Sequence, residues 1–221
     1  MSGFFRDAPG VYRSRLLTRF DWLDHGFGTR HADPHPAPLT LKQVHSDLVL
    51  RAPQAPGCEG DALVTSQPGV VVAVRTADCV PILLAGPGNR VAAAVHAGWK
   101  GTALAIVRRT VERMHADFGS RPAHLYAAIG PSIGACCYQV GPEVAEQFRH
   151  LFPERGDLHR PTHLDLPEAN RRLLLAAGLP EDHIAVSGLC TFCSPREFHS
   201  WRRDREKAGR MLSSIGIREA S

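Results

Sequence analysis

The sequence has little cysteine and no long apolar run. Its six cysteines in 221 residues are too sparse for a disulfide scaffold, so we expect free thiols in a reducing compartment. No stretch approaches the roughly 20 apolar residues that a membrane helix needs, and the first residues lack the apolar segment of a secretory signal. We therefore expect a cytoplasmic chain that does not interact with a membrane.

Several common catalytic and binding signatures are also missing. The chain contains no GxSxG, no P-loop and no GxGxxG, so esterase, nucleotide-phosphate and dinucleotide hypotheses lack support. The formal net charge is only +4, and the basic residues are scattered apart from a cluster at 202–205. This charge pattern does not predict a nucleic-acid partner, whereas a small anionic substrate is compatible with it.

What is present is the composition of an ordinary globular protein. The chain is 43% hydrophobic and 22% charged, and it contains no internal repeat or long linker, so we predict a single domain over residues 1–221. Predicted strands outnumber predicted helices, and most neighbouring strands are joined by tight turns. These features predict an α+β fold, a layered α/β sandwich with mixed, largely hairpin-linked β-sheets flanked by helices.

The helices are predicted from periodicity and capping signals. Apolar residues recur at three- and four-residue steps between residues 102 and 118. Asp165 and Glu168 have the spacing of a capping box, so a second helix should follow Asp165 and end before Gly178. Two further helices are expected over 142–151 and 203–215. Runs rich in Val, Ile and Leu predict strands at residues 41–50, 60–65, 69–74, 125–129 and 184–186.

The segment 75–101 is the centre of the chain. It contains two apolar runs, 80–84 and 91–95, separated by the turn Gly-Pro-Gly-Asn at 86–89. This pattern predicts two buried strands joined as a hairpin. A hairpin returns its outer ends to the same edge of a sheet, so we expect Cys79 and His96 to be neighbours in space.

His45, Cys79 and His96 form the strongest candidate site. Each lies at the end or edge of a predicted strand among small or polar residues. Two imidazoles and one thiolate make a three-ligand set for zinc that leaves a fourth position for water or substrate, and copper could accept the same ligands. Gln43 lies two positions before His45 and so on the same face of the predicted strand. The alternative is a buried free cysteine with two core histidines.

The remaining cysteines are weaker candidates. Cys190-x-x-Cys193 could be half of a zinc ribbon or a redox pair, but the chain has no second CxxC, and Pro195 interrupts a thioredoxin-like continuation. Cys136 and Cys137 are adjacent, so we expect their side chains to diverge and to pack in a tight loop. A structural role is therefore expected for these four cysteines.

Seven segments of the sequence resemble one known family. The resemblance is to the bacterial laccase-domain (YfiH-type) proteins, and the segments occur in the order of that family over nearly the whole chain. They are HGFGTR at 25–30, QVHSD at 43–47, GDALVT at 60–65, RTADCVPILL at 75–84, VHAGWKG at 95–101, IGPSIGACCYQVG at 129–141 and CTFCSPREFHSWRRDREKAGR at 190–210.

The resemblance implies a metal site at His45, Cys79 and His96, the histidines and cysteine of the QVH, ADC and HAGW motifs. It implies zinc as the metal, with copper also reported in the family, and a sandwich fold similar to that of cysteine-dependent deamidating toxins. Lys100 stands where the family usually has Arg. Lysine keeps the charge but loses the two-pronged grip on a phosphate or carboxylate.

The activity that the resemblance implies is zinc-dependent purine nucleoside phosphorolysis. The enzyme would cleave adenosine, inosine and S-methyl-5'-thioadenosine with phosphate, and adenosine deamination by a zinc-activated water would be a second activity.

The matched motifs supply candidates for the other parts of this site. Arg30, Lys100 and Arg202 are the candidates for binding phosphate, and Gln43 could contact the substrate. Asp61 and Asp78 are candidates for supporting the histidines or for proton transfer.

Three alternatives remain open on the sequence. A copper-dependent polyphenol oxidase is the older function given to the family, but a single mononuclear site is a poor match for four-electron reduction of dioxygen. A cysteine hydrolase could use Cys79 as nucleophile with a histidine as base, for example on an amide of a peptidoglycan precursor. In a non-enzymatic protein, the metal site would be structural or the chain would act by binding a partner.

Overall fold

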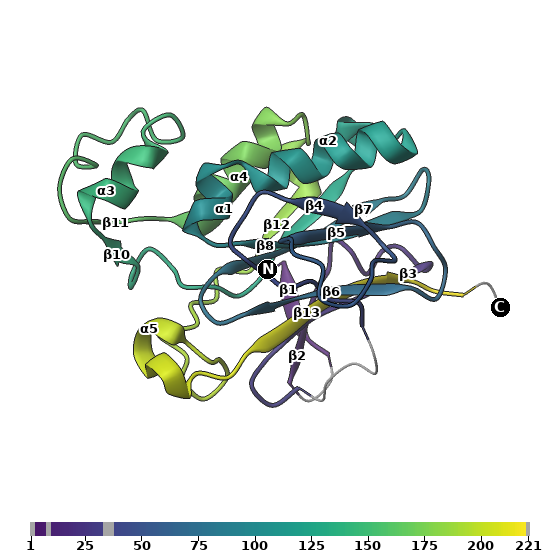
Figure 1. Cartoon of the computed structure of the whole chain (residues 1–221), viewed down its shortest axis with the longest axis horizontal. Helices are drawn as coiled ribbons and strands as arrows, with labels where there is room; N and C mark the ends of the chain where they lie inside the picture. The colour runs from purple at the N-terminus through teal and green to yellow at the C-terminus, as the bar shows by residue number, and fades with distance from the viewer. Residues whose placement is uncertain (1–2, 8–9, 33–37, 220–221) are drawn as a thin grey trace.

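Two β-sheets lie face to face, and helices cover the outer face of one of them (Figure 1). The structure is a computed structural model that describes residues 3–7, 10–32 and 38–219. Its three layers confirm the layered α+β sandwich that the sequence predicts, although only one of the two sheets is mixed. Among the described residues, no helix is both long enough and apolar enough to cross a membrane.

The sheet beneath the helices has six strands in the order β12–β9–β7–β8–β5–β4. Its two outer pairs are parallel and its inner pairs are antiparallel, which makes it a mixed sheet. Its strands are β4 (Val49–Arg51), β5 (Ala62–Thr65), β7 (Val80–Gly86), β8 (Val91–Ala97), β9 (Tyr126–Ile129) and β12 (Ile184–Val186).

The second sheet is antiparallel and has five strands in the order β1–β2–β3–β13–β6. Its strands are β1 (Phe4–Arg6), β2 (Val11–Ser14), β3 (Leu23–Gly28), β6 (Val71–Thr76) and β13 (Met211–Ile217). A separate two-stranded ribbon pairs β10 (Gln139–Val140) with β11 (Thr162–His163). The helices are α1 (Trp99–Ala103), α2 (Ile106–Phe118), α3 (Pro142–Ala145), α4 (Leu166–Ala176) and α5 (Trp201–Asp204).

The hairpin of β7 and β8 is the centre of the core, and every residue of these two strands is buried. One face, which includes Leu83 and Ala94, packs on residues of the five-stranded sheet such as Phe27. The other face, which includes Ile82, packs beneath α2 and α4. A strand that is covered on both faces needs apolar residues at every position, which explains the continuous apolar runs in the sequence.

Several predictions of local structure are confirmed. The 75–101 segment forms the predicted hairpin, with Val80 opposite Ala97 and Pro81 opposite His96. The predicted strands at 60–65, 69–74 and 125–129 correspond to β5, β6 and β9. The Asp165 side chain accepts a hydrogen bond of 2.9 Å from the backbone N–H of Glu168 and caps α4.

Two predicted helices are shorter than expected. The helix predicted over 102–118 is divided into α1 and α2, because Ala105 adopts the left-handed conformation with φ of 59° and turns the chain. The turn lets Ile106 and Val107 bury fully against the sheet. The helix predicted over 142–151 ends after α3 and continues as a 3-10 turn over Glu146–Phe148.

Two further predictions differ from the structure, one in type and one in extent. The segment predicted as a helix over 203–215 contains only the end of α5, and its last residues begin the strand β13. Pairing with both β3 and β6 supplies β13 with hydrogen bonds on both edges, and this tertiary context overrides local periodicity. The strand predicted over 41–50 is reduced to β4, because residues 44–46 bond to the Asp61 carboxylate instead of to a neighbouring strand.

Candidate metal centre

Three side chains with metal-binding atoms meet at one edge of the six-stranded sheet. His45 comes from the loop before β4, Cys79 directly precedes β7, and His96 belongs to β8. The ligand atoms of these residues all lie within 4.8 Å of one another, and the two imidazole centroids are 4.9 Å apart. The structure thus brings together the three residues that the sequence singles out.

The backbone around this group is unusual. His45 and Asp78 both have positive φ, of 60° and 88°, which few residues other than glycine adopt. Gly98 leaves space for the ligands, because a Cβ at this position would lie 3.1 Å from both the Cys79 Sγ and the His45 Cδ2. Such local strain is typical of functional sites, where the surrounding structure holds a side chain in a required position.

The Asp61 carboxylate fixes the positions of both histidines. One oxygen lies 2.8 Å from the His96 Nδ1 and accepts a 3.0 Å hydrogen bond from the His45 backbone N–H. The other accepts hydrogen bonds from the Val44 N–H at 3.3 Å and from the Ser46 N–H and Oγ at 2.7 Å each. Asp61 is fully buried, so these contacts replace its hydration shell and lock the loop of His45 against β8.

The charges of the site are strongly coupled. Burial opposes ionisation of Cys79, but hydrogen bonds with His45 and His96 outweigh it and lower the pKa of the thiol to about 6. Burial also disfavours a charged His96, yet its hydrogen bonds with Asp61 and Cys79 raise its pKa to about 9. Desolvation of Asp61 is likewise overcome by hydrogen bonds from His96 and Ser46, which lower its pKa to about 2.

The donor set fits a single transition-metal ion. One thiolate and two imidazoles are ligands that zinc accepts, with a fourth position left for water or substrate, and copper accepts them too. The contact of Asp61 with the His96 Nδ1 leaves the Nε2 as the ligating nitrogen, the arrangement that orients histidines at many metal sites.

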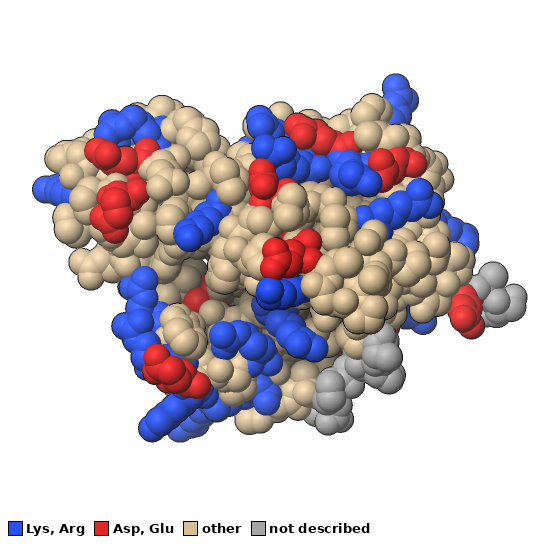
Figure 2. All heavy atoms as spheres, in the orientation of Figure 1, with Lys and Arg blue, Asp and Glu red and all other residues tan. Residues whose placement is uncertain are grey.

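A cavity of about 720 Å³ adjoins the three residues. Residues of α1, of the loop 133–138 and of α5 line it. Figure 2 shows a hollow between the lobe that carries α3 and the region of α5, with Lys and Arg side chains gathered on the α5 side. Trp99, Tyr138 and Trp201 contribute aromatic surface to the lining, so the cavity offers both cationic and aromatic contacts.

The structure places two of the other candidate residues at the cavity and two outside its lining. Arg202 and Gln43 line the cavity, but Arg30 and Lys100 are outside the set of lining residues. Arg30 is exposed and donates a 2.6 Å hydrogen bond to the Pro195 carbonyl, and the Lys100 Nζ lies 5.6 Å from the centroid of the Trp99 ring. Our expectation that these two cations bind phosphate is therefore not supported by their positions.

Asp78 lines the cavity but faces α5. Within the described residues its carboxylate bonds to the Thr191 Oγ1 at 2.7 Å, the Ser200 Oγ at 3.1 Å and the Arg202 backbone N–H at 2.7 Å, and not to a histidine. These contacts do not provide the support of the histidines that we expected from Asp78. What the contacts support is a positioning role, in which Asp78 holds the start of α5 and with it Arg202.

Sequence reasoning missed several residues of the cavity wall. Tyr138 lies beneath Arg202, whose guanidinium carbon is 5.2 Å from the ring centroid, and the Arg202 Nη1 donates a 2.9 Å hydrogen bond to the Gln139 carbonyl. Three further arginines line the cavity, namely Arg75, Arg205 and Arg210. The only signal for Tyr138 was its place in the matched segment 129–141, because Arg202, the cation over its ring, is distant in sequence.

Comparison with known proteins gives a consistent result. A family model described as "Multi-copper polyphenol oxidoreductase laccase" matches residues 29–218. A purine nucleoside phosphorylase of Deinococcus radiodurans is 49% identical over 180 residues, which are 80% of this chain and 69% of that protein. A protein named adenosine deaminase RL5, from an unknown prokaryotic organism, is 40% identical over 161 residues, which are 70% of this chain and 61% of that protein.

The fold is also that of a solved relative. The purine nucleoside phosphorylase YlmD of Geobacillus stearothermophilus is 44% identical over 174 residues, and this alignment spans 76% of the chain but only 63% of the relative. A crystal structure of YlmD from that organism superposes with a TM-score of 0.89 and 32% identity, covering 99% of this chain and 100% of that chain.

Proposed function

The chain belongs to the multi-copper polyphenol oxidoreductase laccase family, and we propose that it is a zinc-dependent purine nucleoside phosphorylase. Its substrates would be adenosine, inosine and S-methyl-5'-thioadenosine, each cleaved by phosphate to the free base and a ribose 1-phosphate. The observation that carries the proposal is the convergence of His45, Cys79 and His96 beside a cavity lined with arginines and aromatic rings.

The three ligands would hold the zinc ion, and a bound zinc ion would act as a Lewis acid and lower the pKa of a water molecule. The rest of the chemistry falls to the side chains of this chain. Phosphorolysis forms a bond from a phosphate oxygen to C1' of the ribose as the bond from C1' to the purine breaks. The site must therefore hold a phosphate dianion and assist the departure of the base.

Arg202 is the best-placed cation for phosphate. Its guanidinium lines the cavity, and the hydrogen bond from its Nη1 to Gln139 fixes its orientation while other N–H groups stay available. A guanidinium donates two parallel hydrogen bonds to phosphate, which lysine cannot do. Arg75 also lines the cavity and would add to the positive potential.

Trp99 and Trp201 would hold the purine by stacking, because their rings line the cavity, and Tyr138 would contact it through its hydroxyl. Burial and the nearby Cys79 raise the pKa of Tyr138 to about 12, so its hydroxyl keeps its proton at neutral pH. That hydroxyl would donate a hydrogen bond to a ring nitrogen of the base as the nitrogen gains electron density, which would stabilise the departing base.

Adenosine deamination would be a second reaction of the same cavity. The name of the RL5 relative supports it, and so does the open position in the ligand set, because deamination at C6 of a purine requires an activated water. The two reactions would share the binding of the base and differ in whether phosphate is present.

Metal content and product analysis on purified protein test the proposal. We expect zinc in the protein and phosphate-dependent release of adenine from adenosine, with inosine reporting deamination. Cys79→Ala and His45→Ala should lose both phosphorolysis and the zinc of this site. Arg202→Gln should raise the KM for phosphate, whereas Arg121→Gln, at an exposed position before β9, should leave it unchanged. Phosphorolysis that survives in the metal-free variants would refute the role of zinc.

A second candidate function rests on the low pKa of Cys79. A thiolate paired with two imidazoles is the arrangement of a cysteine nucleophile with its base, which supports an amide hydrolase, for example one acting on a peptidoglycan precursor. Chelator treatment separates the candidates. The phosphorylase should lose activity with its metal, whereas the hydrolase should retain or gain activity because its thiolate is released.

A further inference from the structure

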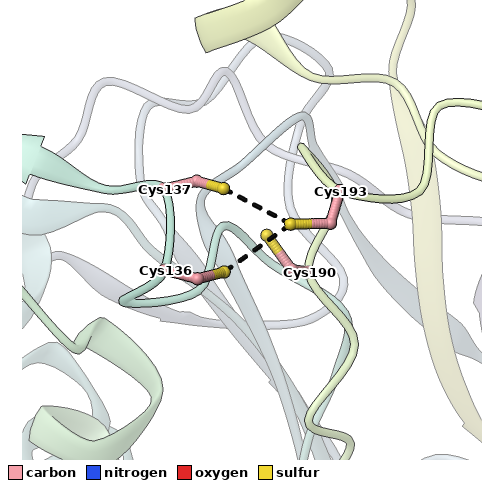
Figure 3. A group of neighbouring side chains, drawn as sticks. All are labelled: Cys136, Cys137, Cys190 and Cys193. Carbon is pink, nitrogen blue, oxygen red and sulfur yellow. Dashed lines mark hydrogen bonds between the residues drawn. The ribbon is translucent and has the colours of Figure 1, made fainter.

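The four cysteines outside the candidate centre that come from residues 136–193 also meet in space (Figure 3). Cys136 and Cys137 belong to the loop before β10, and Cys190 and Cys193 to the loop after β12. All four Sγ atoms lie within 4.8 Å of one another, and the Cys193 Sγ is 3.7 Å from Cys136 and 3.3 Å from Cys137. The expectation that Cys136 and Cys137 diverge is therefore wrong, because both side chains point to the same partner.

These distances suit one tetrahedral ion. Four thiolates around zinc at about 2.3 Å stand about 3.8 Å apart, close to the separations seen here. A disulfide would require a separation of about 2.05 Å and would join only two of the four sulfurs. An iron–sulfur cluster distributes its thiolates over several irons and so needs a wider spacing than a single ion does.

Backbone N–H groups form hydrogen bonds that hold the two loops next to each other. The Gly134 N–H donates to the Cys190 Sγ at 3.3 Å, and the Thr191 N–H donates to the Ser132 carbonyl at 3.0 Å. Gly134 itself packs against the sulfurs, since a Cβ at this position would lie 3.4 Å from the Cys136 Sγ and 3.7 Å from the Cys190 Sγ. The cluster is thus fixed by contacts that do not themselves depend on a metal.

We propose that Cys136, Cys137, Cys190 and Cys193 bind one zinc ion as a closed structural site, distinct from the group of His45, Cys79 and His96. Two of the ligands come from the CxxC motif, and the other two come from the adjacent cysteines 136 and 137 and not from another CxxC. With four thiolate ligands the site has no open position, so it does not act in catalysis.

The site connects two loops that lead to residues of the cavity wall. The first loop continues directly into Tyr138, and the second leads into α5 and Arg202. The Arg203 Nη1 donates to the carbonyls of Thr191 at 2.8 Å and Phe192 at 2.9 Å, which links the CxxC loop to α5. A zinc ion that joins the two loops would therefore hold Tyr138 and α5, which both line the cavity, in fixed positions relative to each other.

A variant that lacks the other candidate centre isolates this site. We would purify the His45→Ala/Cys79→Ala protein under reducing conditions, measure its zinc by mass spectrometry and record its zinc X-ray absorption spectrum. We expect about one zinc per chain, surrounded only by sulfur at about 2.3 Å. Adding Cys190→Ser and Cys193→Ser should remove that zinc, whereas adding Cys58→Ser, which changes a cysteine of neither group, should not.

Each outcome decides the proposal. Zinc absent from the His45→Ala/Cys79→Ala protein, iron in place of zinc, or nitrogen and oxygen in the first coordination shell would overturn it. Free-thiol titration of the denatured, unreduced protein adds a check, because fewer than five thiols would indicate a disulfide. If the serine variant fails to fold, the sulfur-only spectrum of the parent variant still supports the site. Since the parent lacks His45 and Cys79, failure of the proposed phosphorylase activity would leave this result unchanged.

Discussion

Replacing Asp61 by asparagine is the most informative single change at the candidate centre. The substitution keeps the size of the side chain but exchanges one acceptor oxygen for an NH2 group. If the NH2 group takes the position near His96, the His45 N–H loses its acceptor, and His96 must place its proton on Nε2, the nitrogen needed for metal. If the NH2 group takes the other position, the backbone N–H groups of Val44 and Ser46 face a donor.

The magnitude follows from these contacts. Each buried donor that loses its acceptor costs about 1–3 kcal/mol, so the loss of one or two such bonds should lower the free energy of unfolding by about 1–6 kcal/mol. Groups that orient a ligating histidine typically account for about 10–100-fold in metal affinity. We therefore expect Asp61→Asn to weaken zinc binding by about 10–100-fold, even in the fraction of the protein that is fully folded.

The assay is competition for zinc with a chromophoric chelator, combined with urea unfolding of the metal-free protein. Asp47→Asn is the matched control, because Asp47 lies in the same loop but, within residues 3–7, 10–32 and 38–219, pairs only with the exposed Arg109, at 2.8 Å. Such a surface pair contributes about 0–1 kcal/mol, so the control should behave as wild type. The cysteine cluster is unchanged in both variants and cancels in the comparison. Zinc affinity of Asp61→Asn within twofold of Asp47→Asn would refute the reasoning.

Two further changes test other parts of the structure. His25 is buried, and desolvation together with the nearby Arg13 lowers its pKa to about 4, so the unfolded chain binds a proton that the folded chain excludes. Stability is then complete above the unfolded pKa of about 6.5 and falls as the pH drops toward 4. Between pH 7 and pH 5 the wild type should lose about 2 kcal/mol more than His25→Gln in urea unfolding, and equal losses would contradict this account. Gly98→Ala should displace His45 or Cys79 at a cost of about 1–3 kcal/mol, which is about 10–100-fold in zinc affinity by chelator competition. Gly88→Ala, in open space, is its control, and equal affinities in the two variants would contradict the steric argument.

The sequence predicts the parts of the site that depend on local structure. The juxtaposition of Cys79 and His96 follows from two apolar runs and a turn, because a hairpin has only one way to return its ends. The cap at Asp165 follows in the same way from the three-residue spacing of Asp165 and Glu168. Each of these features is decided within a few tens of residues, where periodicity and turn chemistry are sufficient evidence.

The features that the sequence did not predict depend on long-range pairing. β13 has local periodicity that also suits a helix, and only its two strand partners decide its conformation. The Arg202 side chain reaches the cavity because Asp78, far away in the sequence, holds the start of α5. The meeting of Cys137 with Cys193 likewise depends on where two separate loops cross. No spacing rule along the chain encodes such contacts.

The place of β13 in its sheet has a consequence for the synthesis of the protein. β13 lies between β3 and β6, although those strands are translated far earlier. Until residues 211–217 leave the ribosome, β3 and β6 each present an unpaired edge to the cell, and such edges recruit other strands. α5, which carries the cavity wall, is also translated only shortly before β13. We therefore expect nascent chains stalled before residue 211 to require chaperones, and the cavity to form only after β13 has been synthesised.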